Sequence, residues 1–130
     1  MKSIVMVVCA IFCMLGGAFH SAAGLPALHG MLAKTNVSAE LAKELEIVWV
    51  FMGTAMVTFG LMLLTCGLRM RRRDYSGSAL AMWVAAFLIL FDAGGMIWYG
   101  KLEPHFSAFI IVGVLVVFAA LPSKRAPQKA

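Results

Sequence analysis

"IVWVFMGTAMVTFGLMLLTCGLRMRRR", residues 47–73, decides the fold of this chain. Residues 47–68 carry no charged side chain, whereas four of the last five residues are arginines. A helix of about 20 apolar residues crosses the hydrocarbon core of a bilayer, and its backbone groups are paired within the segment, as lipid requires. Arginines concentrate on the cytoplasmic side of membranes. The stretch therefore predicts a transmembrane helix that ends in a cytoplasmic turn.

The rest of the chain repeats this pattern. The sequence is 62% hydrophobic and 13% charged, with a mean hydropathy of +0.92, which leaves too much apolar surface for a soluble domain of 130 residues to bury. Strict alternation of apolar and polar residues, which a β-barrel needs, is absent. We predict an all-α fold, an integral membrane four-helix transmembrane bundle formed by one domain, 1–130. Its expected parts are spans at about 4–23, 47–68, 79–98 and 105–121, an outer loop at 24–46, a cytoplasmic turn at 69–78 and a cytoplasmic tail at 122–130.

The distribution of basic residues predicts the orientation. With four spans, both termini and the turn between the second and third spans lie on one side, which carries eight of the eleven basic residues: Lys2, Arg69, Arg71, Arg72, Arg73, Lys124, Arg125 and Lys129. The other side carries Lys34, Lys43 and Lys101. We expect both termini to be cytoplasmic.

The first span has a second interpretation. The basic start, the apolar run and the small residues near Ala23 are also typical of a secretory signal peptide. Cleavage would leave three spans with the N-terminus outside. We expect the segment to be retained, because the apolar run is long for a signal peptide and continues into residues 25–32.

The outer loop carries its own local signals. Pro26 and Gly30 are expected to break or kink the chain. Ser38 is a candidate N-cap and Glu40 lies in the first turn of the helix that follows, where the helix dipole favours an acid. We expect this helix to run directly into the second span or to lie briefly along the membrane interface.

Small residues recur every seven positions in two spans. The second span holds Gly53, Gly60 and Gly67, and the third holds Ala79, Ala86 and Ala93, with Gly100 continuing the repeat. Seven residues make nearly two helical turns, so each set forms a stripe. Helices in lipid associate by close packing, which small residues permit. We predict that these stripes face each other or a neighbouring helix; the alternative is that small residues are simply common in membrane helices.

Asp92 interrupts the third span. A carboxylate at the centre of a bilayer costs roughly 2.5–3.5 kcal/mol, although Asp92 lies nearer the outer boundary. His20, His29 and His105 all fall on that outer side. We expect Asp92 to hydrogen-bond His20 or another outer-side group. Two alternatives are that the acid and the histidines carry protons or bind a small ligand, and that Asp92 only reaches water.

No motif for catalysis, for a metal or for a cofactor is evident. The histidines and Asp92 lack the i,i+4 pairs of a strong metal motif. Cys9, Cys13 and Cys66 fall in the inner halves of their spans and are interpreted as small buried side chains rather than disulfides. No phosphate-binding loop or nucleophile elbow occurs. We therefore predict no catalytic residue, no metal and no cofactor.

"GAFHSAAGLPAL", followed by "VWVFMGTAMVTFGLMLL", resembles a group of short bacterial membrane proteins with four spans. The matching residues are Gly17, His20, Ser21, Gly24, Trp49 and Gly60. In outline the chain is also similar to DoxX-like four-helix proteins. The resemblance implies a multi-pass protein of the bacterial inner membrane and implies no catalytic role.

Two functions follow as hypotheses, with a membrane enzyme as a weaker third. The first is a non-enzymatic accessory or interaction protein whose partners are the lipid bilayer and either a second copy or a larger membrane protein, with no nucleic acid. The second is a protein that handles protons, a quinone or another small ligand through Asp92 and His20. The first predicts that Asp92→Asn is tolerated while Gly60→Leu disrupts a complex, and the second predicts the reverse.

Overall fold

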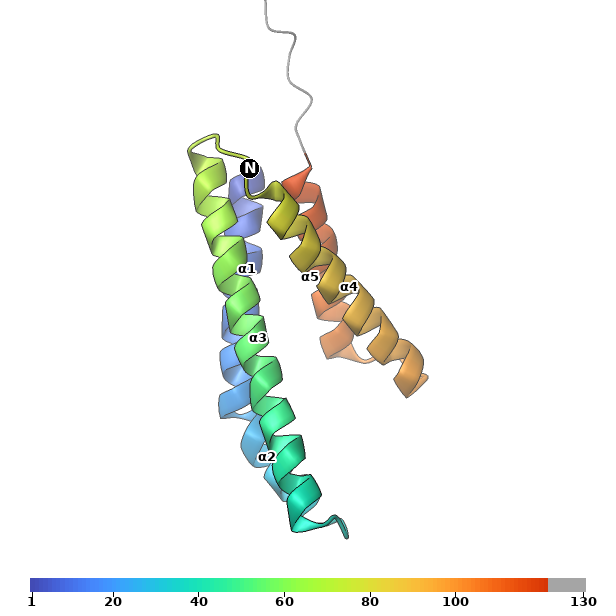
Figure 1. Ribbon diagram of the computed structural model, residues 1–130. Coiled ribbons are helices and arrows are strands. Elements are labelled where there is room, and N and C mark those ends of the chain that lie inside the picture. The colour runs from blue at the N-terminus through green and yellow to red at the C-terminus, as the bar shows by residue number, and fades with distance from the viewer. Residues whose placement is uncertain (122–130) are drawn as a thin grey trace, which may run out of the picture. The chain divides into compact units, whose positions relative to one another are not determined.

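The computed structural model describes residues 1–121, and every regular element in that range is an α-helix. The elements in chain order are α1 (Lys2–Ala22), α2 (Gly24–Leu32), α3 (Ala39–Arg71), α4 (Ser78–Tyr99) and α5 (Pro104–Ala120) (Figure 1). The all-α prediction is confirmed. The predicted cytoplasmic tail, 122–130, with Lys124, Arg125 and Lys129, lies outside the described residues.

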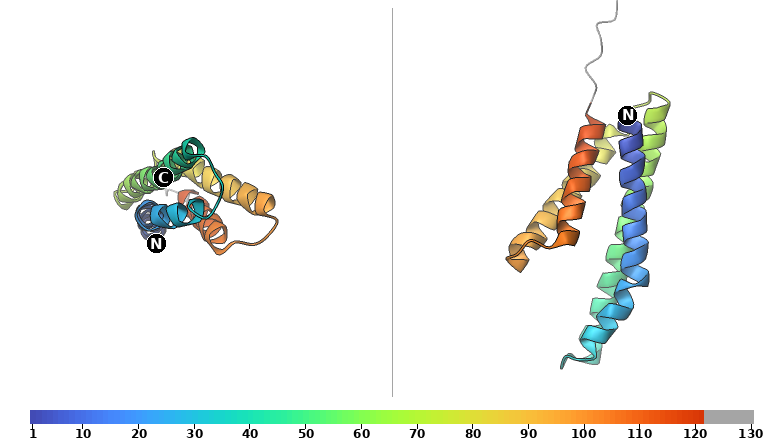
Figure 2. Two further views of the ribbon diagram at one scale, coloured as in Figure 1. Left: turned by 90° about the horizontal axis from the view of Figure 1, so that it is seen from below. Right: turned by 180° about the vertical axis from the view of Figure 1, so that it is seen from behind.

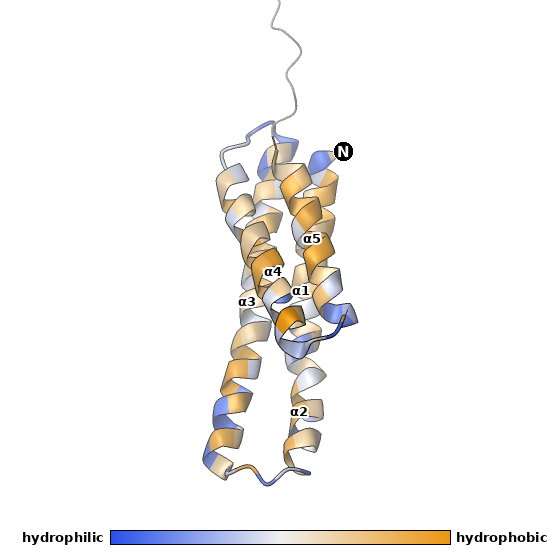
Figure 3. Cartoon of the chain, turned by 90° about the vertical axis from the view of Figure 1, so that its right-hand side faces the viewer, coloured by the Kyte–Doolittle hydropathy of each residue, from blue (hydrophilic) through white to orange (hydrophobic). Residues whose placement is uncertain are grey.

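Three helical segments are long and apolar enough to cross a membrane: Lys2–Leu32, Ala39–Arg71 and Ser78–Tyr99. The fourth predicted span corresponds to α5, an apolar helix of 17 residues. At 1.5 Å per residue α5 is about 25 Å long, which is slightly shorter than the ~30 Å hydrocarbon core. Figure 3 shows that apolar residues cover most of α4 and α5, while polar residues gather at the turns and at the start of α3.

The segment expected to be an outer loop differs from the prediction. Residues Gly24–Leu32 form helix α2, separated from α1 only at Ala23. Pro26 is tolerated because it lies in the first turn of α2, where a backbone N–H has no intrahelical acceptor. Gly30 lies within the helix without breaking it. The connection between α2 and α3 is therefore reduced to residues 33–38.

The predicted start of the second long helix is confirmed. The Ser38 side-chain oxygen accepts a hydrogen bond from the Leu41 N–H at 3.2 Å, and Glu40 lies in the first turn. From this cap α3 continues for 33 residues without interruption. The helix thus runs directly into the second predicted span, and it is about 50 Å long.

The chain divides into two compact units, one formed by Met1–Cys9 with the chain from Met62 onward, the other by Ala10–Leu61. In the second unit the end of α1 and α2 lie beside the first half of α3 (Figure 2). In the first unit α4 and α5 lie side by side, joined by residues 100–103. Gly95 faces Phe106, and Gly113 faces Ile89, so the contacts run in opposite directions along the two helices. The α4–α5 pair is therefore antiparallel.

Most of the buried apolar side chains are small, although Met6 and Leu63 are also fully buried, and many large apolar side chains are exposed. The buried set includes Ala10, Cys13, Ala81, Ala85, Val116 and Ala119. By contrast, Trp98 is 90% exposed and Trp83 is 76% exposed. In water, such extensive apolar exposure would be unfavourable for a soluble monomer. The described helices therefore expose many of their large apolar side chains, including two of the three tryptophans.

Candidate functional site

His20 and Trp49 form the best defined contact among the predicted site residues. Their rings are stacked, with centroids 4.3 Å apart and an interplanar angle of 12°. The Trp49 Nε1–H also donates a hydrogen bond to the His20 carbonyl oxygen at 2.9 Å. That carbonyl lies in the last turn of α1, where helix carbonyls lack intrahelical donors. Trp49 therefore holds the end of α1 against α3 through both its ring and its N–H group.

Glycines make this contact sterically feasible. A Cβ atom on Gly24 would lie 2.8 Å from Trp49 Nε1, and one on Gly17 would lie 2.5 Å from the Gly53 carbonyl oxygen. A side chain at Gly17 would push against the backbone of α3, and one at Gly24 would displace the Trp49 ring. The Ser21 side chain fills the space beside Gly53. We call the set Gly17, His20, Ser21, Gly24, Trp49 and Gly53 the α1–α3 junction.

A second polar contact closes the pair beyond this junction. His29 Nε2 of α2 lies 2.9 Å from Glu46 Oε1 of α3, and both side chains are partly exposed. The contact is an ion pair when the imidazole is protonated and a hydrogen bond when it is neutral. It links α2 to the segment of α3 that precedes the apolar run. Sequence reasoning placed His29 on the outer side but did not find its partner.

The glycine stripe lies against α1. Gly53, Gly60 and Gly67 are all buried. Within the second unit Gly60 faces Ala10 and Met14, and within the first unit Gly67 faces Met6 and Val7. Each glycine thus occupies a position where the backbone of α3 approaches α1.

The alanine stripe of α4 does not coincide with the buried face of that helix. Ala79 is exposed, and Ala86 and Ala93 are half-buried. The buried face carries a different set: Ala81, Val84, Ala85, Leu88 and Asp92. This set also repeats with helical spacing, so two faces of α4 fit the helical period. That the alanine stripe packs against a neighbouring helix stays a prediction.

Asp92 lies on the buried face of α4 and is 5% exposed. It is the one buried charged residue among residues 1–121. Within that part of the chain its carboxyl group forms no ion pair and no hydrogen bond. His20 and His29 belong to the second compact unit and Asp92 to the first, so the expected hydrogen bond between Asp92 and His20 stays a prediction.

His105 lies in the first turn of α5 and is exposed. Its ring centroid is 4.1 Å from that of Phe106. Next to it, the Lys101 ammonium group forms an ion pair with Glu103. This hydrogen-bonded contact lowers the pKa of the Glu103 carboxyl group. The Glu103 carbonyl oxygen accepts hydrogen bonds from Ser107, so the turn between α4 and α5 is ordered by its own residues.

The basic turn between α3 and α4 is held by an aspartate. The Asp74 carboxylate accepts a hydrogen bond from the Ser76 backbone N–H at 2.9 Å and lies 3.2 Å from Arg69 Nε. Hydrogen bonds from Ser76, through its side chain and its backbone, lower the pKa of the Asp74 carboxyl group. Arg73, just after the end of α3, adopts a left-handed conformation with φ of 62°.

The comparisons with known proteins add no further assignment. The chain matches no protein-family model, no curated protein and no solved structure. Among residues 1–121 no three His, Cys, Asp or Glu side chains gather as metal ligands. The side chains of Cys9, Cys13 and Cys66 are buried, as predicted. The site therefore has to be interpreted from its geometry, which brings Gly17, His20, Ser21, Gly24 and Trp49 together at the α1–α3 junction.

Proposed function

We propose that this chain is a four-span protein of the bacterial inner membrane that acts as a non-enzymatic accessory or interaction protein. The exposure of large apolar side chains on every long helix supports insertion, because lipid is the solvent that favours such a surface. The burial of small residues supports the same conclusion, since close backbone approach stabilises helix pairs in lipid.

Contacts inside the first unit support an even number of spans. The Lys2 side chain donates a hydrogen bond to the Leu121 carbonyl oxygen and lies over the Phe118 ring, so the start of α1 meets the end of α5. The Cys66 thiol contacts the Gly77 carbonyl oxygen, which brings the end of α3 to the start of α4. The start of α1, the end of α5 and the basic turn fall on one side when α5 also crosses the membrane. The positive-inside rule makes that side cytoplasmic.

The observation that carries the interaction function is a helical hairpin, which lies on the outer side in the proposed orientation. It consists of α2 and residues 39–46 of α3, and we call it the outer hairpin. Residues 39–46 extend the second span by about 12 Å. The His29–Glu46 contact and the Trp49–His20 contact hold the two arms together. A pre-formed hairpin of this kind gives a partner a defined surface at low entropic cost.

The glycine stripe does not serve this role in the proposal. Because Gly53, Gly60 and Gly67 already lie against α1, they are not free for lateral association with a partner. Gly60→Leu should therefore destabilise the fold itself, and loss of a complex in that variant would be a secondary effect. The outer hairpin replaces the glycine stripe as the surface to test.

Site-specific photo-crosslinking in the native membrane tests the proposal. A crosslinking residue at the exposed Lys43 of the outer hairpin should give one adduct of defined mass, either a dimer or a single larger protein. The same residue at Leu90, exposed on α4, is the control and should give lipid adducts only. Glu46→Ala should weaken the adduct at position 43. Equal protein adducts at both positions, or none at position 43, would contradict the role of the outer hairpin.

Asp92 supports a second candidate, a proton- or small-ligand-handling protein. A carboxyl group that is 5% exposed and lacks a polar partner within residues 1–121 is costly to keep in a membrane helix. Intramembrane acids are therefore candidate functional groups. Native mass spectrometry of wild type and Asp92→Asn separates the two candidates. A small bound mass that disappears in the variant favours ligand handling, whereas an unchanged oligomer or partner favours the accessory role.

A further inference from the structure

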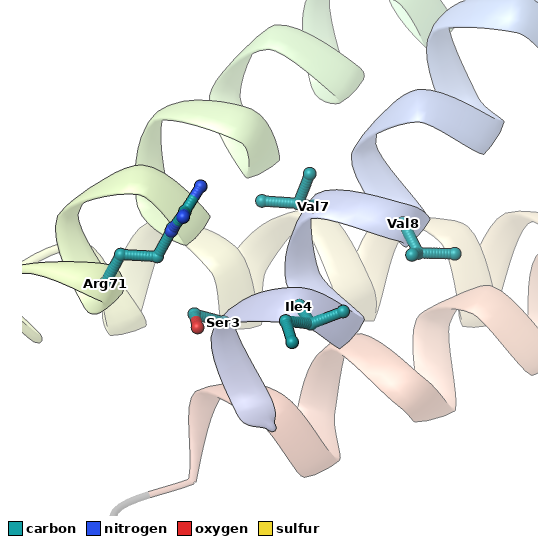
Figure 4. Close-up of a pocket in the computed structure, with 5 residues that line it drawn as sticks. All are labelled: Ser3, Ile4, Val7, Val8 and Arg71. Atoms are coloured by element: carbon teal, nitrogen blue, oxygen red, sulfur yellow. The ribbon is translucent and has the colours of Figure 1, made fainter.

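The inner end of the first unit contains a groove that no part of the proposed function uses. Its volume is about 470 Å³, and it is lined by Ser3, Ile4, Val7 and Val8 of α1 and by Arg71 of α3 (Figure 4). Ile4 is 63% exposed and Val8 is 60% exposed. Figure 4 shows the Arg71 side chain extending from α3 toward α1. The groove thus combines one cationic group with an apolar wall.

The Arg71 charge is not neutralised inside the described chain. Two other basic groups at this end have partners: Lys2 bonds the Leu121 carbonyl oxygen, and Arg69 pairs with Asp74. Within residues 1–121 Arg71 forms no ion pair and no hydrogen bond. A guanidinium group offers paired N–H donors that match the oxygens of a phosphate. The Arg71 guanidinium group in the groove is therefore available to bind a phosphate.

The order of groups along α1 matches a phospholipid. Ser3, with its hydroxyl group, lies in the first turn of the helix, and Val7 and Val8 lie about 6–8 Å further along its axis. Polar groups at the end of a span meet the headgroup layer, and apolar groups one turn deeper meet acyl chains. A free phosphate ion would use Arg71 but would leave the wall of Ile4, Val7 and Val8 uncovered.

We propose that this groove binds one anionic phospholipid, with its phosphate on Arg71 and Ser3 and an acyl chain along Ile4, Val7 and Val8. The inference rests on the proposed insertion of the chain in the membrane, with this end in the inner leaflet. It adds a specific lipid site to that proposal, distinct from the general attraction of the basic turn for anionic headgroups.

Native mass spectrometry of the full-length, delipidated protein in detergent tests the site by titration with phosphatidylglycerol and, separately, phosphatidylcholine. Wild type should bind the first phosphatidylglycerol roughly tenfold more tightly than phosphatidylcholine, as one charge-assisted contact allows. Arg71→Gln should lose this preference, and Arg71→Lys should keep part of it. Arg72→Gln is the matched control, because it removes the same charge from the neighbouring residue, which does not line the groove. Excess inorganic phosphate should not displace the lipid.

Two results would overturn the lipid site. One is an unchanged preference in Arg71→Gln, and the other is an equal loss in Arg71→Gln and Arg72→Gln, which would indicate diffuse attraction by the basic turn. Helix content measured by circular dichroism identifies a variant that fails to fold. If Arg71→Gln fails to fold, the lipid preference of Arg71→Lys is the test of the site.

Alkaline carbonate extraction of wild-type membranes is done first. Release of the protein into the supernatant would contradict membrane insertion, whereas retention followed by either result above would contradict the lipid site alone.

Discussion

At the level of single residues, Gly17 is the position where the helices leave least room. A Cβ atom there would lie 2.5 Å from the Gly53 carbonyl oxygen and 2.9 Å from the Val57 nitrogen, and backbone atoms of a helix cannot move aside cheaply. We expect Gly17→Ala to lower the free energy of unfolding by about 1–3 kcal/mol. Gly94→Ala is the matched control, since a Cβ atom at Gly94 meets nothing within 4 Å. It should be neutral or gain up to about 1 kcal/mol from helix propensity.

Thermal melting of the two glycine variants in one detergent measures this difference. Equal melting temperatures for Gly17→Ala and Gly94→Ala would show that the α1–α3 junction is not closely packed. A loss confined to Gly17→Ala would support the close approach of α1 and α3 in the second unit.

A second prediction for a single residue is that the stability of the basic turn depends on the ionisation of Asp74. Hydrogen bonds from Ser76 and the charge of Arg69 keep the folded-state pKa of Asp74 below its ordinary value, which is about 3.9 in unfolded chains. At pH values above the unfolded-state pKa, the ionised Asp74 therefore stabilises the turn. This stabilisation is lost as the pH falls through the lower folded-state pKa. A carbon NMR titration of the carboxyl group should show a midpoint below the ordinary one. Ser76→Ala should raise the midpoint, because it removes the first of these hydrogen bonds. A wild-type midpoint at or above the ordinary value would exclude this turn geometry.

Residue-level reasoning from the sequence succeeded where a residue has one dominant role. Ser38 could be predicted as a cap and the three cysteines as buried thiols, because local chemistry decides both. The buried face of α4 could not be predicted, because almost every residue of this helix is apolar and more than one face fits the helical period. The environment of Asp92 depends on which of those faces turns inward, so it required the structure.

At the level of elements, the cap at Ser38 controls the first turn of α3. Its side-chain oxygen satisfies the Leu41 N–H, which would otherwise have no intrahelical acceptor. Ser38→Ala should destabilise this end of the helix by about 1 kcal/mol and accelerate hydrogen exchange at Leu41. Ser38→Asp, which keeps an acceptor, is the control and should retain the wild-type exchange rate. Exchange that is equally slow in Ser38→Ala would show that the cap does not stabilise the outer hairpin.

The second helix, α2, shows why elements outside the spans are harder to predict. Pro26 and Gly30 are ordinary helix breakers in a sequence, yet α2 includes both. Proline is accepted because it falls in the first turn, a location that depends on the helix boundary at Ala23. Leu28 is buried and His29 contacts Glu46, so tertiary contacts with the rest of the second unit outweigh the local signals.

At the level of the whole molecule, composition and charge predict more than any motif does. The apolar runs predicted the ends of α1, α4 and α5 to within about two residues, whereas α3 begins at Ala39, well before the apolar run that starts at Ile47. The asymmetry of the basic residues predicted that the chain start, the basic turn and the end of α5 share a side. The Lys2–Leu121 contact is consistent with that arrangement for the two ends. Partner identity has no comparable physical signal in the sequence.

The most direct test of the proposed topology is cysteine labelling of spheroplasts, which lack the outer membrane but keep a sealed inner membrane. The reagent is a maleimide that cannot cross the inner membrane. The three native cysteines are buried, so wild type should stay unlabelled. Asn36→Cys in the α2–α3 loop and Leu102→Cys in the α4–α5 turn should react at once, and Ser76→Cys in the basic turn should react only after permeabilisation. Labelling of Ser76→Cys in intact spheroplasts, or protection of Leu102→Cys, would contradict a four-span protein with both termini in the cytoplasm.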